Sequence, residues 1–238
     1  MKIKQNINNF FRQIRYTIYI FYLNSKIKKK INFSYSNKDT LKLLFNKYGS
    51  DKGNLNNKHN YSIIYEALFG KLKNNKLNLM EVGLGSIDEN VEFHMKFMGK
   101  DYRPLASLYA WRDYFKNANI YGADIDKKIL KNTKRIKTFH VDMLNSNSIK
   151  KMWNQLNKKI DIFIDDGFHS FEANTNLFKF SFKFLKKNGF YIIEDIHRKP
   201  SNINKFYKFF MEKKLNFKII DLYHKNNVSD NCLIIIKK

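Results

Sequence analysis

Past residue 38, hydrophobic segments of strand length alternate with helical patterns, and this alternation limits the fold more than any other feature. Strands that alternate with helices are typical of α/β folds, so we predict a doubly wound, mostly parallel sheet. The expected strands are Leu77–Val82, Ile120–Asp124, Ile136–Val141, Ile160–Ile164, Phe190–Ile193, Phe217–Tyr223 and Cys232–Ile236. The expected helices run from Asp39 or Thr40 to about Lys47, and over Tyr61–Leu72, Leu105–Phe115, Ser146–Leu156, Phe171–Leu185 and Asn202–Lys213. A polar loop joins the last two strands, which predicts an antiparallel hairpin at the end of the sheet.

The composition excludes several classes of protein. The chain has 238 residues, of which 43% are hydrophobic and 16% aromatic, so it has room for one domain and enough apolar side chains for a core. Cys232 is the only cysteine, which excludes an intramolecular disulfide and a multi-cysteine zinc site. We therefore expect a reducing, cytoplasmic location.

The formal net charge is +24, which raises the question of a nucleic-acid partner. Arginine occurs at only six positions, so the excess is lysine, accompanied by abundant Asn and Ile, as A/T-rich codons would produce. Nucleic-acid sites favour arginine because its planar fork makes bidentate contacts. Because the charge comes from lysine, it is weak evidence for a nucleic-acid partner. Methylation of RNA or another polyanion stays an alternative.

The first 38 residues differ from the rest, because they contain nine basic residues and no acidic one. Their apolar centre, Tyr16–Leu23, is too short for a membrane-spanning helix and lacks the cleavage site of a secretory signal. Two interpretations stay open. A basic amphipathic helix can lie in an anionic membrane surface, or it can pack on the domain with its lysines in solvent. We divide the chain into a basic helical extension, 1–38, and a domain, 39–238.

Chemistry is expected at the carboxyl ends of the strands, where open α/β sheets bind ligands. The first strand ends in Glu81-Val82-Gly83-Leu84-Gly85, and its glycines allow a ligand to approach the backbone. Asp88 stands where a nicotinamide-binding fingerprint has its third glycine. An acidic residue two positions before the first glycine is instead typical of S-adenosylmethionine enzymes. The alternative is that these are ordinary turn glycines.

Acidic residues also end the next two strands. Asp124 can accept hydrogen bonds from both hydroxyls of a ribose, and Asp142 can hold the amino group of adenine. Together with Glu81, these carboxylates favour a nucleoside pocket.

The fourth and fifth strands end in reactive groups, Asp165-Asp166-Gly167-Phe168-His169 and Glu194-Asp195. Carboxylates at adjacent strand ends can converge, and their oxygens suit Mg²⁺ or Mn²⁺ rather than zinc. His169 can accept a proton from a hydroxyl that attacks a methyl group. The alternative is that the acids cap helices and His169 is a structural hydrogen bonder.

These segments, taken together over residues 40–197, resemble a known family. The likeness is carried by Tyr48-Gly49-Ser50-Asp51-Lys52-Gly53, His59, Tyr61, Glu81-Val82-Gly83, Ser107-Leu108, Trp111, Phe115, Tyr121-Gly122-Ala123-Asp124-Ile125-Asp126, Ile164-Asp165-Asp166-Gly167-Phe168-His169 and Ile193-Glu194-Asp195. The chain resembles the class I S-adenosylmethionine-dependent methyltransferases related to the macrolide-sugar O-methyltransferases of the mycinamicin and macrocin type. The resemblance implies a seven-stranded Rossmann-like sheet with an antiparallel last strand, and metal-dependent methylation of a sugar hydroxyl.

The resemblance also implies roles for single residues. It makes Asp166, Glu194 and Asp195 metal ligands and His169 the general base. The implied or candidate cofactor contacts are Ser50, Glu81, Gly83, Gly85, Ser107, Asp124 and Asp142. The sequence departs from the family at Ile87, in place of a glycine, at Phe168, and in an inserted loop that runs to Pro104.

We therefore expect an O-methyltransferase that uses S-adenosylmethionine and Mg²⁺ or Mn²⁺ on a sugar of a capsule, lipopolysaccharide or other glycan. The expected location is the cytoplasm, at the inner face of the membrane if residues 1–38 dock there. The alternative that is not an enzyme is a non-catalytic basic protein at the membrane surface. The sequence leaves the sugar, the hydroxyl and the oligomeric state open, a homo-oligomer included.

Overall fold

The structure, a computed structural model, describes residues 2–27, 31–33, 38–55, 58–224 and 226–238. Lys28, Lys29 and Lys30 of the basic extension lie outside these ranges.

Within the described residues, seven strands form one sheet in the order β3-β2-β1-β4-β5-β7-β6. Their bounds are β1 Asn78–Val82, β2 Asn119–Asp124, β3 Ile136–His140, β4 Ile160–Asp165, β5 Leu185–Ile193, β6 Asn216–Asp221 and β7 Cys232–Lys237. β1 to β5 pair in parallel, whereas β7 is antiparallel to both β5 and β6. The predicted fold class, with its antiparallel last strand, is confirmed.

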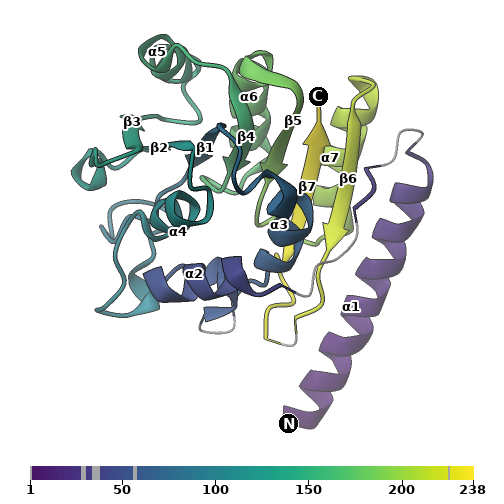
Figure 1. Cartoon of the computed structure of the whole chain (residues 1–238). Helices are drawn as coiled ribbons and strands as arrows, with labels where there is room; N and C mark the ends of the chain where they lie inside the picture. The colour runs from purple at the N-terminus through teal and green to yellow at the C-terminus, as the bar shows by residue number, and fades with distance from the viewer. Residues whose placement is uncertain (1, 28–30, 34–37, 56–57, 225) are drawn as a thin grey trace.

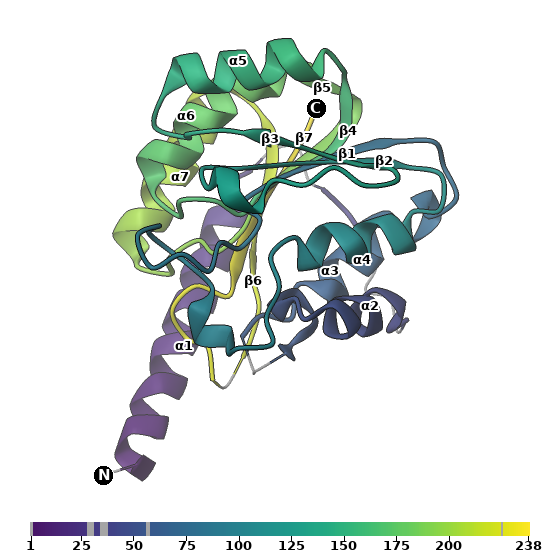
Figure 2. The same cartoon turned by 90° about the vertical axis from the view of Figure 1, so that its left-hand side faces the viewer.

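Helices cover both faces of the sheet (Figures 1 and 2). Their bounds are α1 Lys2–Ser25, α2 Thr40–Tyr48, α3 Ser62–Phe69, α4 Ala106–Tyr114, α5 Ser146–Leu156, α6 Phe171–Ser181 and α7 Pro200–Glu212. Figure 2 shows α2, α3 and α4 on one side of the sheet and α5, α6 and α7 on the other. α1 lies beside β6, the edge strand at the end of the sheet (Figure 1).

The central strands are mostly apolar because both of their faces are buried, and their polar residues lie at or near the strand ends. In β1, Leu79 packs in the core on the α2–α4 side, whereas Met80 and Val82 pack in the core on the α5–α7 side. Successive side chains of a strand point to opposite faces, so one strand supplies both cores. Ile20 and Leu23 of α1 belong to the second of these cores.

Several boundaries differ from the prediction by a few residues, and the largest difference concerns the fifth strand. The sequence pattern placed the fifth strand at Phe190–Ile193, but β5 begins at Leu185, and α6 ends at Ser181. The first half of β5 contains the polar run from Lys186 to Gly189, so it lacks the hydrophobic pattern by which strands are predicted. That half is also irregular, because the register between β4 and β5 shifts between Ile160 and Ile162.

The strand order reverses direction along the chain between β1 and β4, which are neighbours in the sheet. Val82 pairs with Asp165, and Asp165 pairs with Ile193, so the three strands end at the same level. The residues that follow them must therefore share one edge of the sheet, where α/β folds bind ligands.

Candidate active site

A cavity of about 250 Å³ lies at this edge. Most of the predicted site residues line it: Ser50, Gly83, Gly85, Ser107, Asp124, Asp142, Asp166, His169 and Asp195. Glu81 and Glu194 are the two exceptions among the predicted residues, all of which the structure describes, and both are fully buried near the lining. The sequence thus located the cavity and nine of its lining residues.

The turn after β1 brings two loops into contact. Gly83 and Gly85 have φ angles of 94° and 75°, which side-chain-bearing residues rarely adopt. A Cβ atom at Gly83 would lie 1.9 Å from the carbonyl oxygen of Asp166, so only glycine fits there. The loop after β4 is therefore held directly against the loop after β1.

Asp124 is fixed by backbone amides close to it in the fold. Its Oδ2 accepts a hydrogen bond from the Leu84 amide at 2.6 Å, and its Oδ1 accepts one from the Asp126 amide at 2.8 Å. Burial raises the pKa of Asp124, and these amides oppose that shift. Because each carboxylate oxygen has two lone pairs, both can still accept a bond from a ligand hydroxyl.

Glu81 is wholly buried at the end of β1. Trp111 Nε1 donates to its Oε2 at 2.7 Å, and Lys52 Nζ lies 3.5 Å from its Oε1. Burial raises the pKa of Glu81 to about 7, although the Lys52 ammonium lowers it in part. The ring of Trp111 packs in the core and its indole nitrogen orients this carboxylate.

Lys52 lies inside the group of carboxylates, a placement that the sequence analysis missed. Lys52 is 2% exposed, and its ammonium forms ion pairs with Asp166 and Glu194 as well as with Glu81. Burial lowers the pKa of Lys52, but the three carboxylates outweigh this effect and hold it above its usual value. Tyr65 donates its hydroxyl hydrogen to the other oxygen of Glu194. Glu194 is thus bound on both oxygens by side chains of the protein.

Asp166, His169 and Asp195 form a group whose ligand atoms all lie within 4.8 Å of one another. His169 and Asp195 have φ angles of 50° and 54°, a strained conformation that turns their side chains out of the regular strand direction. His169 Nδ1 is buried and has no hydrogen-bond partner among the described residues. Two carboxylates and an imidazole in this arrangement can bind a divalent cation or move a proton.

A second layer of side chains holds Asp195. The hydroxyl of Tyr61 donates to Asp195 Oδ1 at 2.6 Å, and His59 Nδ1 lies 3.5 Å from the same oxygen. Burial lowers the pKa of His59, but the carboxylates of Asp195 and Asp51 outweigh it, so the pKa is raised. His59 and Tyr61 stood in the motif that carried the family resemblance, and their partner becomes visible only in the fold.

The inserted loop, residues 86–104, covers one side of the cavity. Met95 of this loop donates its backbone amide to Ser86, and Tyr102 places its hydroxyl against Gly85. Phe93 packs edge-on against Phe168 and against the ring of His169. Phe168 thus gives the inserted loop an aromatic surface on which to rest.

Comparisons with known proteins agree with this geometry, although no family model matches the sequence. The chain is similar to 8-demethyl-8-alpha-L-rhamnosyl tetracenomycin-C 2'-O-methyltransferase of Streptomyces olivaceus, with 29% identity over 153 residues, which are 63% of this chain and 36% of that protein. Demethylmacrocin O-methyltransferase of Streptomyces fradiae is 28% identical over 138 residues, which are 58% of this chain and 32% of that protein.

The solved structures point in the same direction. The MycE methyltransferase from the mycinamycin biosynthetic pathway, in complex with Mg and SAH, matches with a TM-score of 0.54 and 26% identity over 67% of this chain and 38% of that one. The predicted resemblance to macrolide-sugar O-methyltransferases and the class I methyltransferase fold are confirmed. The chain spans about a third of the length of the curated relatives it matches.

Proposed function

We propose that this chain is an S-adenosylmethionine-dependent, divalent-metal-assisted O-methyltransferase that acts on a sugar hydroxyl. The observation that carries the proposal is the group Asp166, His169 and Asp195, which lies in the same cavity as Gly83 and Asp124. One cavity therefore combines a nucleoside-binding strand end with groups that can activate a hydroxyl. Curated relatives whose names describe O-methylation of rhamnosyl compounds support the reaction class.

The residues of the first three strand ends fit the cofactor. Asp124 has lone pairs free for ribose hydroxyls, Gly83 and Gly85 expose backbone, and Asp142 lies at the cavity wall beside them. Ser50 and Ser107 complete the proposed contacts from the side of α2 and α4, and Glu81 supports them from beneath. When bound, S-adenosylmethionine supplies an electrophilic methyl group.

The residues after β4 and β5 fit a hard divalent ion. Asp166, Glu194 and Asp195 are the proposed ligands, and Mg²⁺ or Mn²⁺ would orient and acidify the acceptor hydroxyl. Asp166 and Asp195 face the cavity. Both oxygens of Glu194 are already bound by Lys52 and Tyr65, so Glu194 is the least available of the three carboxylates for a metal ion.

His169 is the proposed general base. Its buried, unpartnered Nδ1 can accept a proton, and the ring of Phe93 restricts its orientation. Asp166 and Asp195 beside it would stabilise the resulting imidazolium. His169 thus takes the proton of the acceptor hydroxyl as its oxygen attacks the methyl carbon.

The proposed acceptor is a sugar of a capsule, lipopolysaccharide or other surface glycan, methylated in the cytoplasm at the inner face of the membrane. In this proposal residues 39–238 carry out the reaction, and residues 1–38 place the enzyme at the membrane.

Calorimetric titration with S-adenosylhomocysteine, with and without Mg²⁺, tests the cofactor and metal sites. We expect Asp124→Ala to weaken binding by about 10- to 100-fold, the worth of hydrogen bonds from one carboxylate. Asp166→Asn should abolish the dependence on Mg²⁺. The matched control is Asp161→Asn, because Asp161 is at the opposite end of β4 and pairs with Lys186. If the wild-type chain produces no heat of binding, the proposal fails.

Transfer assays with S-adenosylmethionine and rhamnose-bearing acceptors test the reaction. His169→Gln should lower the rate by about 100-fold or more and leave S-adenosylhomocysteine binding unchanged. Full activity of His169→Gln or of Asp166→Asn would contradict the assigned roles.

A further inference from the structure

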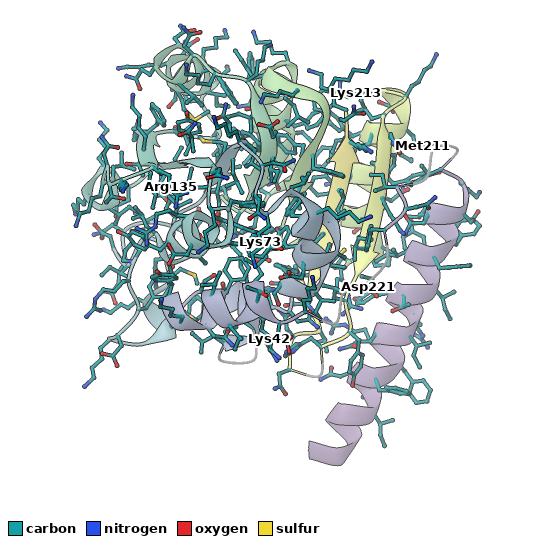
Figure 3. All side chains as sticks on the ribbon, viewed as in Figure 1. Lys42, Lys73, Arg135, Met211, Lys213 and Asp221 are labelled. Atoms are coloured by element: carbon teal, nitrogen blue, oxygen red, sulfur yellow. The ribbon has the colours of Figure 1, made fainter. Side chains whose placement is uncertain are left out.

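One face of α1 packs against the edge of the sheet and is hydrogen-bonded to it. Asn24 exchanges two hydrogen bonds with the backbone of Ile219 in the edge strand β6, at 2.7 and 3.0 Å. Gln13 Nε2 donates to the carbonyl of His224, and Ile20 and Leu23 are buried in the core. Thr17 donates to Asp221, which Figure 3 labels beside the helix. α1 is therefore a fixed part of the surface.

The opposite face of α1 is apolar and exposed. The side chain of Phe21 is 75% exposed, that of Ile18 64% and that of Phe11 56%. The exposed apolar residues of this face are Ile7, Phe10, Phe11, Ile14, Ile18, Phe21 and Tyr22. Residues spaced by three and four share one side of a helix, so they form a continuous stripe along α1. We call these seven residues the outer stripe.

Positive charge accompanies the outer stripe. Arg12, Arg15 and Lys26 are exposed on the same helix, and no acidic residue occurs before Asp39. A second copy of α1 would bring these cations together without any acidic partner, whereas an anionic surface would neutralise them. The charges favour a surface of anionic lipid.

We propose that α1 docks on an anionic phospholipid membrane, with the outer stripe among the acyl chains and Arg12, Arg15 and Lys26 at the phosphate level. In the described ranges, no helix combines the length and apolar character that a bilayer crossing requires. An amphipathic helix that lies in the interface needs neither. This proposal names the surface on which residues 1–38 place the protein, and it does not depend on the transfer reaction.

The docked face continues onto the loop between β6 and β7. Tyr223 of this loop is 65% exposed and shares a small hollow with Phe10, Ile14 and Ile18. The same loop reaches the active site, because the carbonyl oxygen of Asp230 lies 3.1 Å from the Tyr61 hydroxyl. The amino-terminal half of α1 extends past the edge of the sheet at which β6 ends (Figure 1). Docking would thus hold the carboxylate cavity close to the lipid surface.

Co-sedimentation of the full chain with vesicles tests the proposal. We expect binding to vesicles of phosphatidylcholine mixed with phosphatidylglycerol, and much weaker binding to pure phosphatidylcholine. Phe11→Ser with Ile18→Ser should weaken binding by about tenfold or more, because two apolar side chains no longer enter the membrane. Arg12→Gln with Arg15→Gln should have a similar effect that added salt reproduces in the wild type.

Leu43→Ser is the matched control, since Leu43 is 65% exposed on α2, away from α1, and its loss should leave vesicle binding unchanged. Circular dichroism checks that each variant is folded. The proposal is overturned if the wild-type chain ignores anionic vesicles, or if Phe11→Ser with Ile18→Ser binds them as wild type does. Sedimentation that shows a dimer lost in this variant, without vesicle binding, would assign the outer stripe to a second copy and also overturn the proposal.

Discussion

The two halves of the active-site cavity are built in different ways. At the ends of β1 and β2, Asp124 is held by the amides of Leu84 and Asp126, and its position follows from backbone geometry. At the ends of β4 and β5, Glu194 and Asp195 are held by side chains, Lys52 and Tyr61, that lie 142 and 134 residues away in sequence. The first half is fixed by backbone amides, one of which is 40 residues away in sequence, and the second by buried side chains more than 130 residues away. Substitutions should therefore affect the halves differently.

The largest loss of stability is expected at Lys52, the cation that holds the carboxylates at the ends of β4 and β5. Lys52→Met removes the ammonium between Asp166 and Glu194 and leaves buried carboxylates unpaired, which should lower the free energy of unfolding by about 3–5 kcal/mol. Urea denaturation measures this change. Lys42→Met is the control, because Lys42, labelled in Figure 3, is half exposed on α2. If Lys52→Met unfolds at the wild-type urea concentration, the cluster does not depend on its cation.

A pH-dependent effect of intermediate size is expected at Asp165. Burial raises the pKa of this carboxyl to about 7, although bonds from Asn174 and the Gly167 amide lower it in part. The folded state therefore binds a proton that the unfolded state has lost, so stability falls as pH rises from about 4 through about 7. Asp165→Asn has no such proton. Wild type should therefore lose about 2–4 kcal/mol more of its free energy of unfolding than Asp165→Asn does as the pH rises from about 5 to about 8. Urea denaturation at the two pH values measures the difference, and an equal pH slope in both proteins would exclude this origin.

The smallest effect compares one hydroxyl from each half. Tyr61→Phe removes a donor to buried Asp195 that is 134 residues away in sequence. Ser86→Ala removes a donor to Asp126 that is 40 residues away in sequence and 2.6 Å from its Oδ2. We expect losses of about 1–2 kcal/mol for Tyr61→Phe and about 1 kcal/mol or less for Ser86→Ala, because the backbone still holds Asp126 in its turn. Thermal unfolding measures both. A larger loss for Ser86→Ala would reverse the comparison between the halves.

The same comparison explains what the sequence predicted and what it did not. Gly83, Asp124, Asp166 and Asp195 all lie at a strand end or within two residues after it. Because parallel strands end at one edge, the meeting of these residues in one cavity follows from pattern alone. The burial of Lys52 does not follow, because its segment, Tyr48–Gly53, carries the family resemblance but does not show that this lysine, among the many of this chain, is buried beside carboxylates. Its burial depends on where α2 and the turn after it pack.

α1 shows another limit of sequence patterns. The sequence left open whether the basic segment packs on the domain or lies on a membrane, as though these excluded each other. The structure shows that one face is packed, through Ile20 and Leu23, while Phe11 and Ile18 on another face are exposed. A helix that is apolar on opposite sides does not reveal which side meets the protein, because a sheet and a lipid surface select the same side chains.

The ion pair between Lys52 and Glu194 also has a consequence for the order of folding. Lys52 is synthesised before any strand of the sheet, whereas Glu194 follows β5 and leaves the ribosome 142 residues later. Until β5 pairs with β4, the ammonium has Glu81 and Asp166 but lacks the third of its carboxylate partners, Glu194, and closing so long a loop is slow. The carboxylate site is therefore completed late in folding, because Glu194 and Asp195 reach it only when β5 is in place.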